Sequence, residues 1–203
     1  MQTSISLANF RSTKVIWCLA LAFFSLIATL FSWSDLLYYD AEKLAIGEYW
    51  RPFTAWIVQA NISHWALNLW GLVIMGIVLP NQPGRKTFLA FAGVWIFASL
   101  CLMFSDYAAY VGLSGVLYGW LFWSIAMSPF YRPTLKVIVL GLISAKVVIE
   151  NSPLPWLKDS AVSTWVGHDI AYESHLWGLL GGVMTLALYC LFRRFQSNAA
   201  HHG

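Results

Sequence analysis

The chain has few charged residues, and this shortage excludes a class of protein. Only 10% of its 203 residues are charged, whereas soluble domains carry about 25%. Hydrophobic residues make up 59% of the chain and occur in long runs along its whole length. The composition excludes an ordinary soluble domain and indicates an all-α polytopic membrane protein, with residues 1–203 as one membrane domain.

Cysteine and metal-binding patterns are also scarce. The three cysteines, Cys18, Cys101 and Cys190, all lie inside apolar runs without CxxC spacing, which is typical of buried small side chains. The sequence has no HExxH motif, and His168 with His175 would be a poor pair of ligands. We therefore expect no disulfide framework, no metal and no cofactor.

Six apolar segments are predicted to span the membrane. They cover about 15–33, 62–80, 87–105, 113–129, 134–150 and 170–192, and the fourth is short. The first is too long for the apolar region of a signal peptide and lacks a small-x-small site before Asp35. We expect it to remain as a membrane anchor.

The distribution of charge predicts the orientation. With both termini in the cytoplasm, the inner segments hold Arg11, Lys14, Arg85, Lys86, Arg132, Lys136, Arg193 and Arg194. All nine acidic residues then fall in outer segments or at outer ends of spans. Basic residues favour the cytoplasmic side. We expect a multi-pass protein of a bacterial inner membrane with cytoplasmic termini.

The same charges place two polar residues at one depth. Ser114 lies 18 positions before Arg132, and His175 lies 18 positions before Arg193. At about 1.5 Å per helical residue, each lies roughly 27 Å above the inner charges. His64 and Asn68 lie near the outer end of the second span. Polar residues of three spans are thus predicted at a similar level.

Glycine pairs indicate which spans pack together. Gly115 and Gly119 in the fourth span, and Gly178 and Gly182 in the sixth, are each four residues apart. Such faces let membrane helices approach closely. If the two faces meet, Ser114 and His175 become neighbours.

A serine beside a histidine favours acyl-transfer chemistry, because neutral imidazole can take the hydroxyl proton. Glu173 lies on a different helix face from His175, and Asp169 is six positions away. We therefore predict a Ser-His dyad rather than a triad. Tyr118, one turn after Ser114, is expected to pack on the imidazole, or else to be an ordinary core tyrosine.

An oxyanion would need hydrogen-bond donors. His64 and Asn68 share one helix face at i and i+4, and the Ser114 amide at a helix start is a third candidate. Plainer interpretations remain open: His64 as an interfacial histidine, Asn68 as a hydrogen bond between two helices, and Ser114 as a packing residue. A histidine inside a membrane, however, indicates function by default.

Together these residues resemble the rhomboid family of intramembrane serine proteases. The resemblance is carried by GLSG with Tyr118, the HxxxN pair at 64 and 68, SHLWGLLGG in the last span, and YWRPFT at 49–54, which is similar to that family's Trp-Arg element. It runs from about residue 48 to 182, in the expected order. Singly each motif is weak, whereas the combination is specific.

The resemblance implies a rhomboid-like six-helix bundle whose short fourth helix starts within the membrane, below a loop that dips into it. Gly112 and Gly115 lie on either side of Ser114 and would support it. It implies Ser114 as the nucleophile and His175 as the general base. His64, Asn68 and the Ser114 amide would form the oxyanion hole, with Tyr118 stacked on the imidazole. Trp50 and Arg51 would be structural. The site would open to the periplasmic side.

Some positions depart from that pattern, namely Ser174, Gln59 and Pro52. The small size and the AYESH run resemble the rhombosortase subgroup. This would imply substrates with a Gly-Gly motif, an apolar helix and a basic tail at the C-terminus. More generally, the partners would be the lipid bilayer and membrane proteins with a transmembrane segment, and no nucleic acid.

Two other functions are alternatives to a protease. An inactive rhomboid-like protein that binds or escorts membrane clients usually lacks the serine or the histidine, and this chain has both. A small transporter would be expected to show paired halves with broken helices. The sequence shows no internal repeat, and Lys146 is the one clear charge inside a span.

Overall fold

The computed structural model describes residues 13–31, 33–78, 84–153 and 171–199. Each predicted span contains a helix: α1 (Thr13–Leu30), α5 (Ile62–Val78), α6 (Gly84–Met103), α7 (Ser114–Met127), α8 (Pro133–Glu150) and α10 (Tyr172–Ala199). Four of the charged or titratable residues considered above, Arg11, Asp159, His168 and Asp169, lie outside the described residues.

Judged by length and composition, two helical segments are long and apolar enough to cross a membrane: Arg85–Met103 and Tyr172–Asn198. Shorter apolar segments are Val15–Leu30, Ile62–Gly76 and Ser114–Met127. Many large apolar side chains are exposed, including Phe23, Ile138 and Phe192. A soluble protein would not expose apolar surface on this scale, so these side chains suit contact with lipid.

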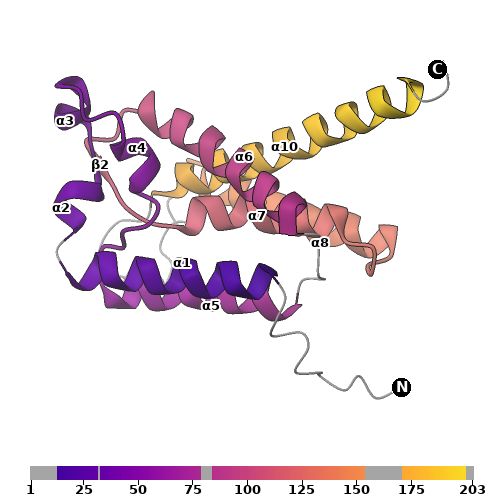
Figure 1. Ribbon diagram of the computed structural model, residues 1–203, viewed down its shortest axis with the longest axis horizontal. Helices are drawn as coiled ribbons and strands as arrows, with labels where there is room; N and C mark the ends of the chain where they lie inside the picture. The colour runs from indigo at the N-terminus through magenta and orange to yellow at the C-terminus, as the bar shows by residue number, and fades with distance from the viewer. Residues whose placement is uncertain (1–12, 32, 79–83, 154–170, 200–203) are drawn as a thin grey trace.

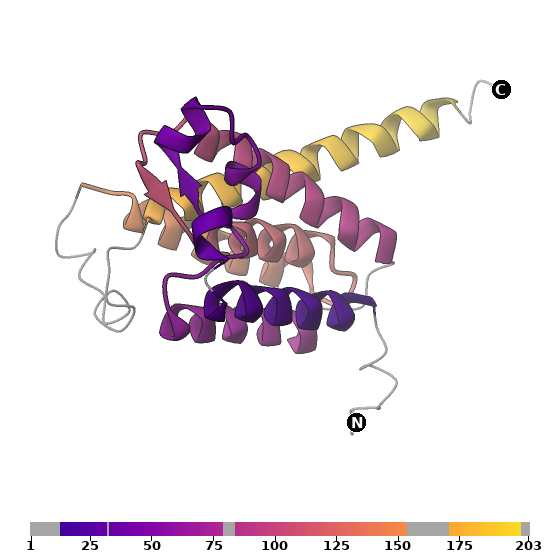
Figure 2. The same ribbon diagram turned by 60° about the vertical axis from the view of Figure 1, so that its left-hand side comes forward.

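The helices are arranged around a central pair. α1 and α5 lie side by side in both views, while α7 packs most extensively against α10 (Figures 1 and 2). α6 contacts both members of the central pair. The C-terminal half of α10 projects away from the other helices (Figure 1).

Glycine allows the close packing of α7 on α10. A Cβ atom added to Gly115 would lie 2.5 Å from the backbone oxygen of Ser174, and one added to Gly182 would lie 2.5 Å from that of Gly119. Side chains at Gly119 and Gly178 would likewise collide with the backbone of the facing helix. The two predicted glycine faces thus meet, backbone against backbone.

The segment between α1 and α5 departs from the all-α prediction. It contains α2 (Ser34–Leu37), β1 (Tyr39–Asp40), α3 (Ala41–Ala45) and α4 (Arg51–Thr54), and β1 pairs with β2 (Ala109–Tyr110), which lies between α6 and α7. The two strands pair antiparallel, with Tyr39 opposite Tyr110. Two residues per strand are too few to leave a pattern of alternation in the sequence. The pairing ties the chain before α7 to the segment after α1.

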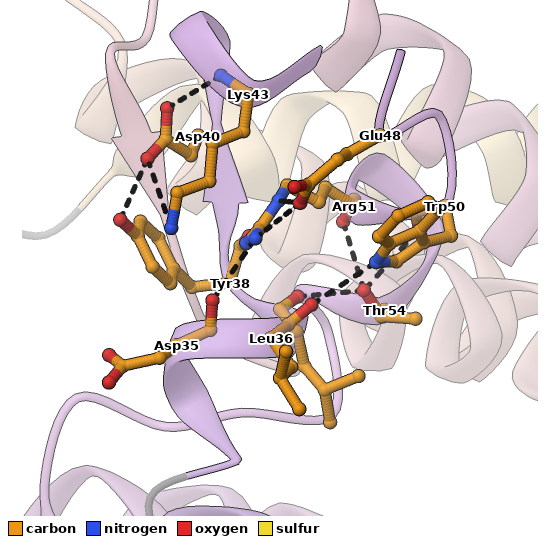
Figure 3. Close-up of polar contacts among 10 residues, drawn as sticks. Asp35, Leu36, Tyr38, Asp40, Lys43, Glu48, Trp50, Arg51 and Thr54 are labelled. Atoms are coloured by element: carbon orange, nitrogen blue, oxygen red, sulfur yellow. Dashed lines mark hydrogen bonds and ion pairs between the residues drawn. The ribbon is translucent and has the colours of Figure 1, made fainter. Parts of the chain in front are cut away.

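Arg51 fixes this segment between α1 and α5 (Figure 3). Its side chain is 2% exposed. The guanidinium donates to the backbone oxygens of Tyr38 at 2.8 Å and Asp35 at 3.1 Å, and to the carboxylate of Glu48 at 2.5 Å. Trp50 donates to the backbone oxygen of Leu36 at 3.2 Å. A buried cation paired in this way holds four chain positions together, which is a structural role.

Asp40 begins α3 as its N-cap, accepting a hydrogen bond from the backbone N–H of Lys43 at 3.1 Å. The hydroxyl of Tyr38 donates to the same carboxylate at 2.7 Å. These bonds, that from Tyr38 first, lower the pKa of Asp40 because they favour its ionised form.

Candidate active site

Ser114 is the first residue of α7, and the backbone before it is unusual. Gly112 has a φ of +132°, which L side chains rarely adopt. A Cβ atom there would lie 2.9 Å from Cε1 of His64. The Gly112 amide donates to the backbone oxygen of Ala55 at 3.2 Å. Glycine at position 112 therefore lets the chain turn beside His64 and then begin the helix.

Ser114 and His175 are in contact. The Oγ atom of Ser114 lies 3.0 Å from Nε2 of His175, which comes from the first turn of α10 and is 6% exposed. The glycine contacts between α7 and α10 bring the two side chains together. At this distance the imidazole can accept the hydroxyl proton directly.

Two aromatic rings hold the imidazole. The ring of Tyr118 stacks on it, with centroids 4.5 Å apart and planes inclined by 34°. Tyr172 meets it edge-on at 6.0 Å. With Nε2 directed at Ser114, the ring has little freedom to turn away.

Sequence reasoning missed a carboxylate beside the histidine. Oε2 of Glu150 lies 3.0 Å from Nδ1 of His175, so the prediction that His175 has no carboxylate partner is wrong. Glu173, which the sequence suggested and discounted, is exposed. Glu150 is the last residue of α8, a helix distant in sequence from both His175 and Ser114. The one feature of the sequence that could have indicated Glu150 is its position four residues after Lys146, the one clear charge inside a predicted span.

His64 lies next to the Ser114 loop, at the start of α5. Its Nδ1 accepts a long hydrogen bond of 3.5 Å from the backbone N–H of Ala60. An uncharged imidazole that accepts at Nδ1 carries its proton at Nε2. That nitrogen would lie 3.2 Å from a Cβ added to Gly112. The donor edge of His64 thus faces the loop immediately before Ser114.

Asn68 makes its shortest hydrogen bond away from the serine. Its Nδ2 donates to Oε1 of Gln59 at 2.7 Å and, at 3.3 Å, to the backbone oxygen of His64. Gln59 in turn donates to Oγ of Ser25 on α1 at 3.2 Å. This buried chain of side chains joins α5 to α1, the helix-joining role that the sequence left open for Asn68.

A cavity of about 820 Å³ surrounds the pair. Ser114, His175, His64 and Asn68 line its polar part together with Glu150 and Lys146. Its apolar lining includes Leu67, Gly71 and Ile74 of α5, Leu121 of α7 and Ile143 of α8. A cavity of this size can hold several residues of an extended peptide with a carbonyl group near Ser114. Within the described ranges, no cluster of three or more His, Cys, Asp or Glu side chains could hold a metal ion.

Comparisons with known proteins identify a family for this chain. The rhomboid domain family matches residues 46–192. A protein of Bacillus subtilis (strain 168), named "Putative rhomboid protease YdcA", is 26% identical over 176 residues, covering 85% of this chain and 83% of that protein. No solved structure matches the chain. A rhomboid domain together with the apolar helices implies a polytopic membrane protein. The chain therefore belongs to the rhomboid family, whose domain includes the helices that carry Ser114 and His175.

Proposed function

We propose that the chain is an intramembrane serine protease that cleaves single-span membrane proteins near the outer face of the bilayer. The observation that carries the proposal is the 3.0 Å contact between Oγ of Ser114 and Nε2 of His175 inside the cavity. The similarity to a protein named as a rhomboid protease supports it.

The reaction begins when Oγ of Ser114 attacks the carbonyl carbon of a substrate peptide bond, while Nε2 of His175 takes the hydroxyl proton. A C–O bond forms, and the carbonyl electron pair moves to the oxygen. That oxyanion is stabilised by the Ser114 amide and by Nε2–H of His64, and Asn68 supports His64 by donating to its backbone oxygen at 3.3 Å. Each donor of this kind is worth about 3 kcal/mol in the transition state.

The intermediate then collapses as the C–N bond breaks, and His175 gives its proton to the departing amine. Water attacks the acyl ester in the second half of the reaction. His175 takes one proton from the water and passes it to Oγ of Ser114 as the ester C–O bond breaks. No metal or cofactor is required by this sequence of steps.

The basic residues of the inner segments support an orientation with cytoplasmic termini and a site on the periplasmic side. We further propose rhombosortase-like substrates, which carry a C-terminal Gly-Gly motif, an apolar helix and a basic tail. The AYESH run at 171–175 and the six-helix size support this narrower proposal.

The test uses wild-type protein and Ser114→Ala in lipid nanodiscs, with two readouts. A fluorophosphonate should label the wild type only, and a reporter with the Gly-Gly, helix and Arg-rich tail should be cleaved by the wild type only. Labelling that survives in Ser114→Ala would contradict Ser114 as nucleophile. Ser114-dependent labelling with no reporter cleavage would overturn the narrower substrate proposal. A wild type that is not labelled would favour a client-binding protein.

A further inference from the structure

We propose that Glu150 is the positioning residue of His175 and that Lys146 anchors it, so that the site works as a Ser-His-Glu triad rather than a dyad. This inference rests on the proposed function. It departs from the dyad that the resemblance implied, and it depends on contacts that only the folded chain reveals.

The first argument is the tautomer of the imidazole. A neutral imidazole has one N–H, and Nε2 must be free of hydrogen to accept the proton of Ser114. The hydrogen must therefore be on Nδ1, which lies 3.0 Å from Oε2 of Glu150. An ionised carboxylate only accepts hydrogen bonds. Glu150 thus selects the tautomer that can act as a base.

The second argument is charge. When His175 takes the serine proton, an imidazolium forms in a site where it is 6% exposed. A carboxylate at Nδ1 stabilises that cation, and Coulomb attraction is stronger at low effective dielectric than in water. Glu150 accepts the Nδ1–H throughout and does not itself take up the proton, as in other serine triads. The chain order Ser, Glu, His also occurs in α/β-hydrolases, which have an unrelated fold.

The third argument is how Glu150 is held. Its Oε1 is paired with Nζ of Lys146, one helical turn earlier on α8. The same ammonium donates to the hydroxyl of Tyr118 at 2.6 Å. Tyr118 is the residue that stacks on the imidazole. Lys146 thus connects two of the neighbours that hold His175, and it compensates a carboxylate that is only 14% exposed.

The end of α8 is also tied to α10. Asn151, the residue after Glu150, donates through Nδ2 to the backbone oxygens of Val147 at 2.9 Å and Tyr172 at 3.0 Å. Tyr172 begins α10, three residues before His175. The position of Glu150 next to the imidazole is therefore fixed by the Asn151 bonds to the backbones of α8 and α10, as well as by the ion pair with Lys146.

The main experiment compares Glu150→Gln with Glu173→Gln in nanodiscs. Both remove one carboxylate near His175, but Glu173 is exposed and lies outside the triad. The glutamine amide at 150 can donate to Nδ1 and so favour the wrong tautomer. We expect the rate of Ser114 labelling by a fluorophosphonate to fall by about 10²–10⁴-fold in Glu150→Gln, and to stay unchanged in Glu173→Gln. Glu150→Asp, which keeps the charge, should retain more activity than Glu150→Gln.

A second readout does not depend on any variant at position 150 folding. In ¹⁵N-histidine spectra of the wild type, the His175 signal, assigned by its loss in His175→Ala, should show the proton on Nδ1. The Lys146→Met substitution should slow labelling of the wild type more than it slows labelling of Glu150→Gln, because the two residues act as one unit.

Two results would overturn the inference. One is Ser114-dependent labelling of folded Glu150→Gln at the wild-type rate. The other is a wild-type His175 with its proton on Nε2. The first would leave the protease proposal intact, and the second would also contradict His175 as the general base of Ser114. A wild type that is not labelled at all would be a failure of the proposed function itself.

Discussion

At the scale of single residues, Gln59 explains how Asn68 is held. The buried amide of Gln59 uses both ends: Oε1 accepts from Asn68, and Nε2 donates to Ser25 on α1. Without that amide, the side-chain nitrogen of Asn68 would keep only its 3.3 Å bond to the backbone oxygen of His64, and Oγ of Ser25 would lose the donor from Gln59. Buried donors and acceptors without partners are costly because they have already lost their hydrogen bonds to water. Gln59 therefore stabilises the contact between α1 and α5 and fixes the side chain of Asn68.

We predict that Gln59→Met lowers the free energy of unfolding by about 1–3 kcal/mol. Methionine fills a similar volume but cannot hydrogen bond to Asn68 or Ser25. The measurement is a denaturation titration in detergent, with Gln196→Met as the control, since Gln196 is exposed on α10. Equal stability of the two variants would show that this hydrogen-bond chain has no net stabilising effect.

At the scale of helices, the close approach of α7 and α10 creates the site. The backbone oxygen of Gly115 faces Gly178, and a methyl group between them would have to separate the two helices. Separation moves His175 away from Ser114, whose contact needs a distance near 3 Å. Activity and helix packing thus depend on the same glycines.

Gly178→Ala is expected to reduce labelling of Ser114 strongly and to destabilise the fold. Gly141→Ala is the matched control, because Gly141 is exposed on α8 and a Cβ there would meet no atom within 4 Å. That control should keep full labelling, since alanine is favoured over glycine in a helix. Labelling of Gly178→Ala at the wild-type rate would contradict the proposed role of the α7–α10 contact.

Sequence patterns could predict the helices and the Ser114–His175 pair because both depend on local information. Apolar runs define helices, glycine spacing defines a packing face, and basic residues define depth. The contact of Glu150 with His175 depends instead on how α8 packs against α10. A periodic pattern in the sequence does not predict the packing of two separate helices. Sequence spacing predicted Asn68 near the level of Ser114, and both residues line the same cavity, but the bond of Asn68 to Gln59 depends on a loop conformation that the sequence pattern does not define.

At the scale of the whole molecule, the orientation decides which compartment the cavity serves. The proposed orientation has the site on the periplasmic side. A charged fluorophosphonate that cannot cross membranes should therefore label intact spheroplasts as fast as permeabilised ones, with Ser114→Ala as the blank. Labelling only after permeabilisation would reverse the orientation and leave the chemistry of the site unchanged.

The central claim is that His175 activates Ser114. The most direct measurement maps the fluorophosphonate adduct by peptide mass spectrometry in the wild type and in folded His175→Ala. The account predicts an adduct on Ser114 in the wild type and none in His175→Ala over the same time. An adduct on another residue, or one on Ser114 that forms equally fast without the imidazole, would contradict it.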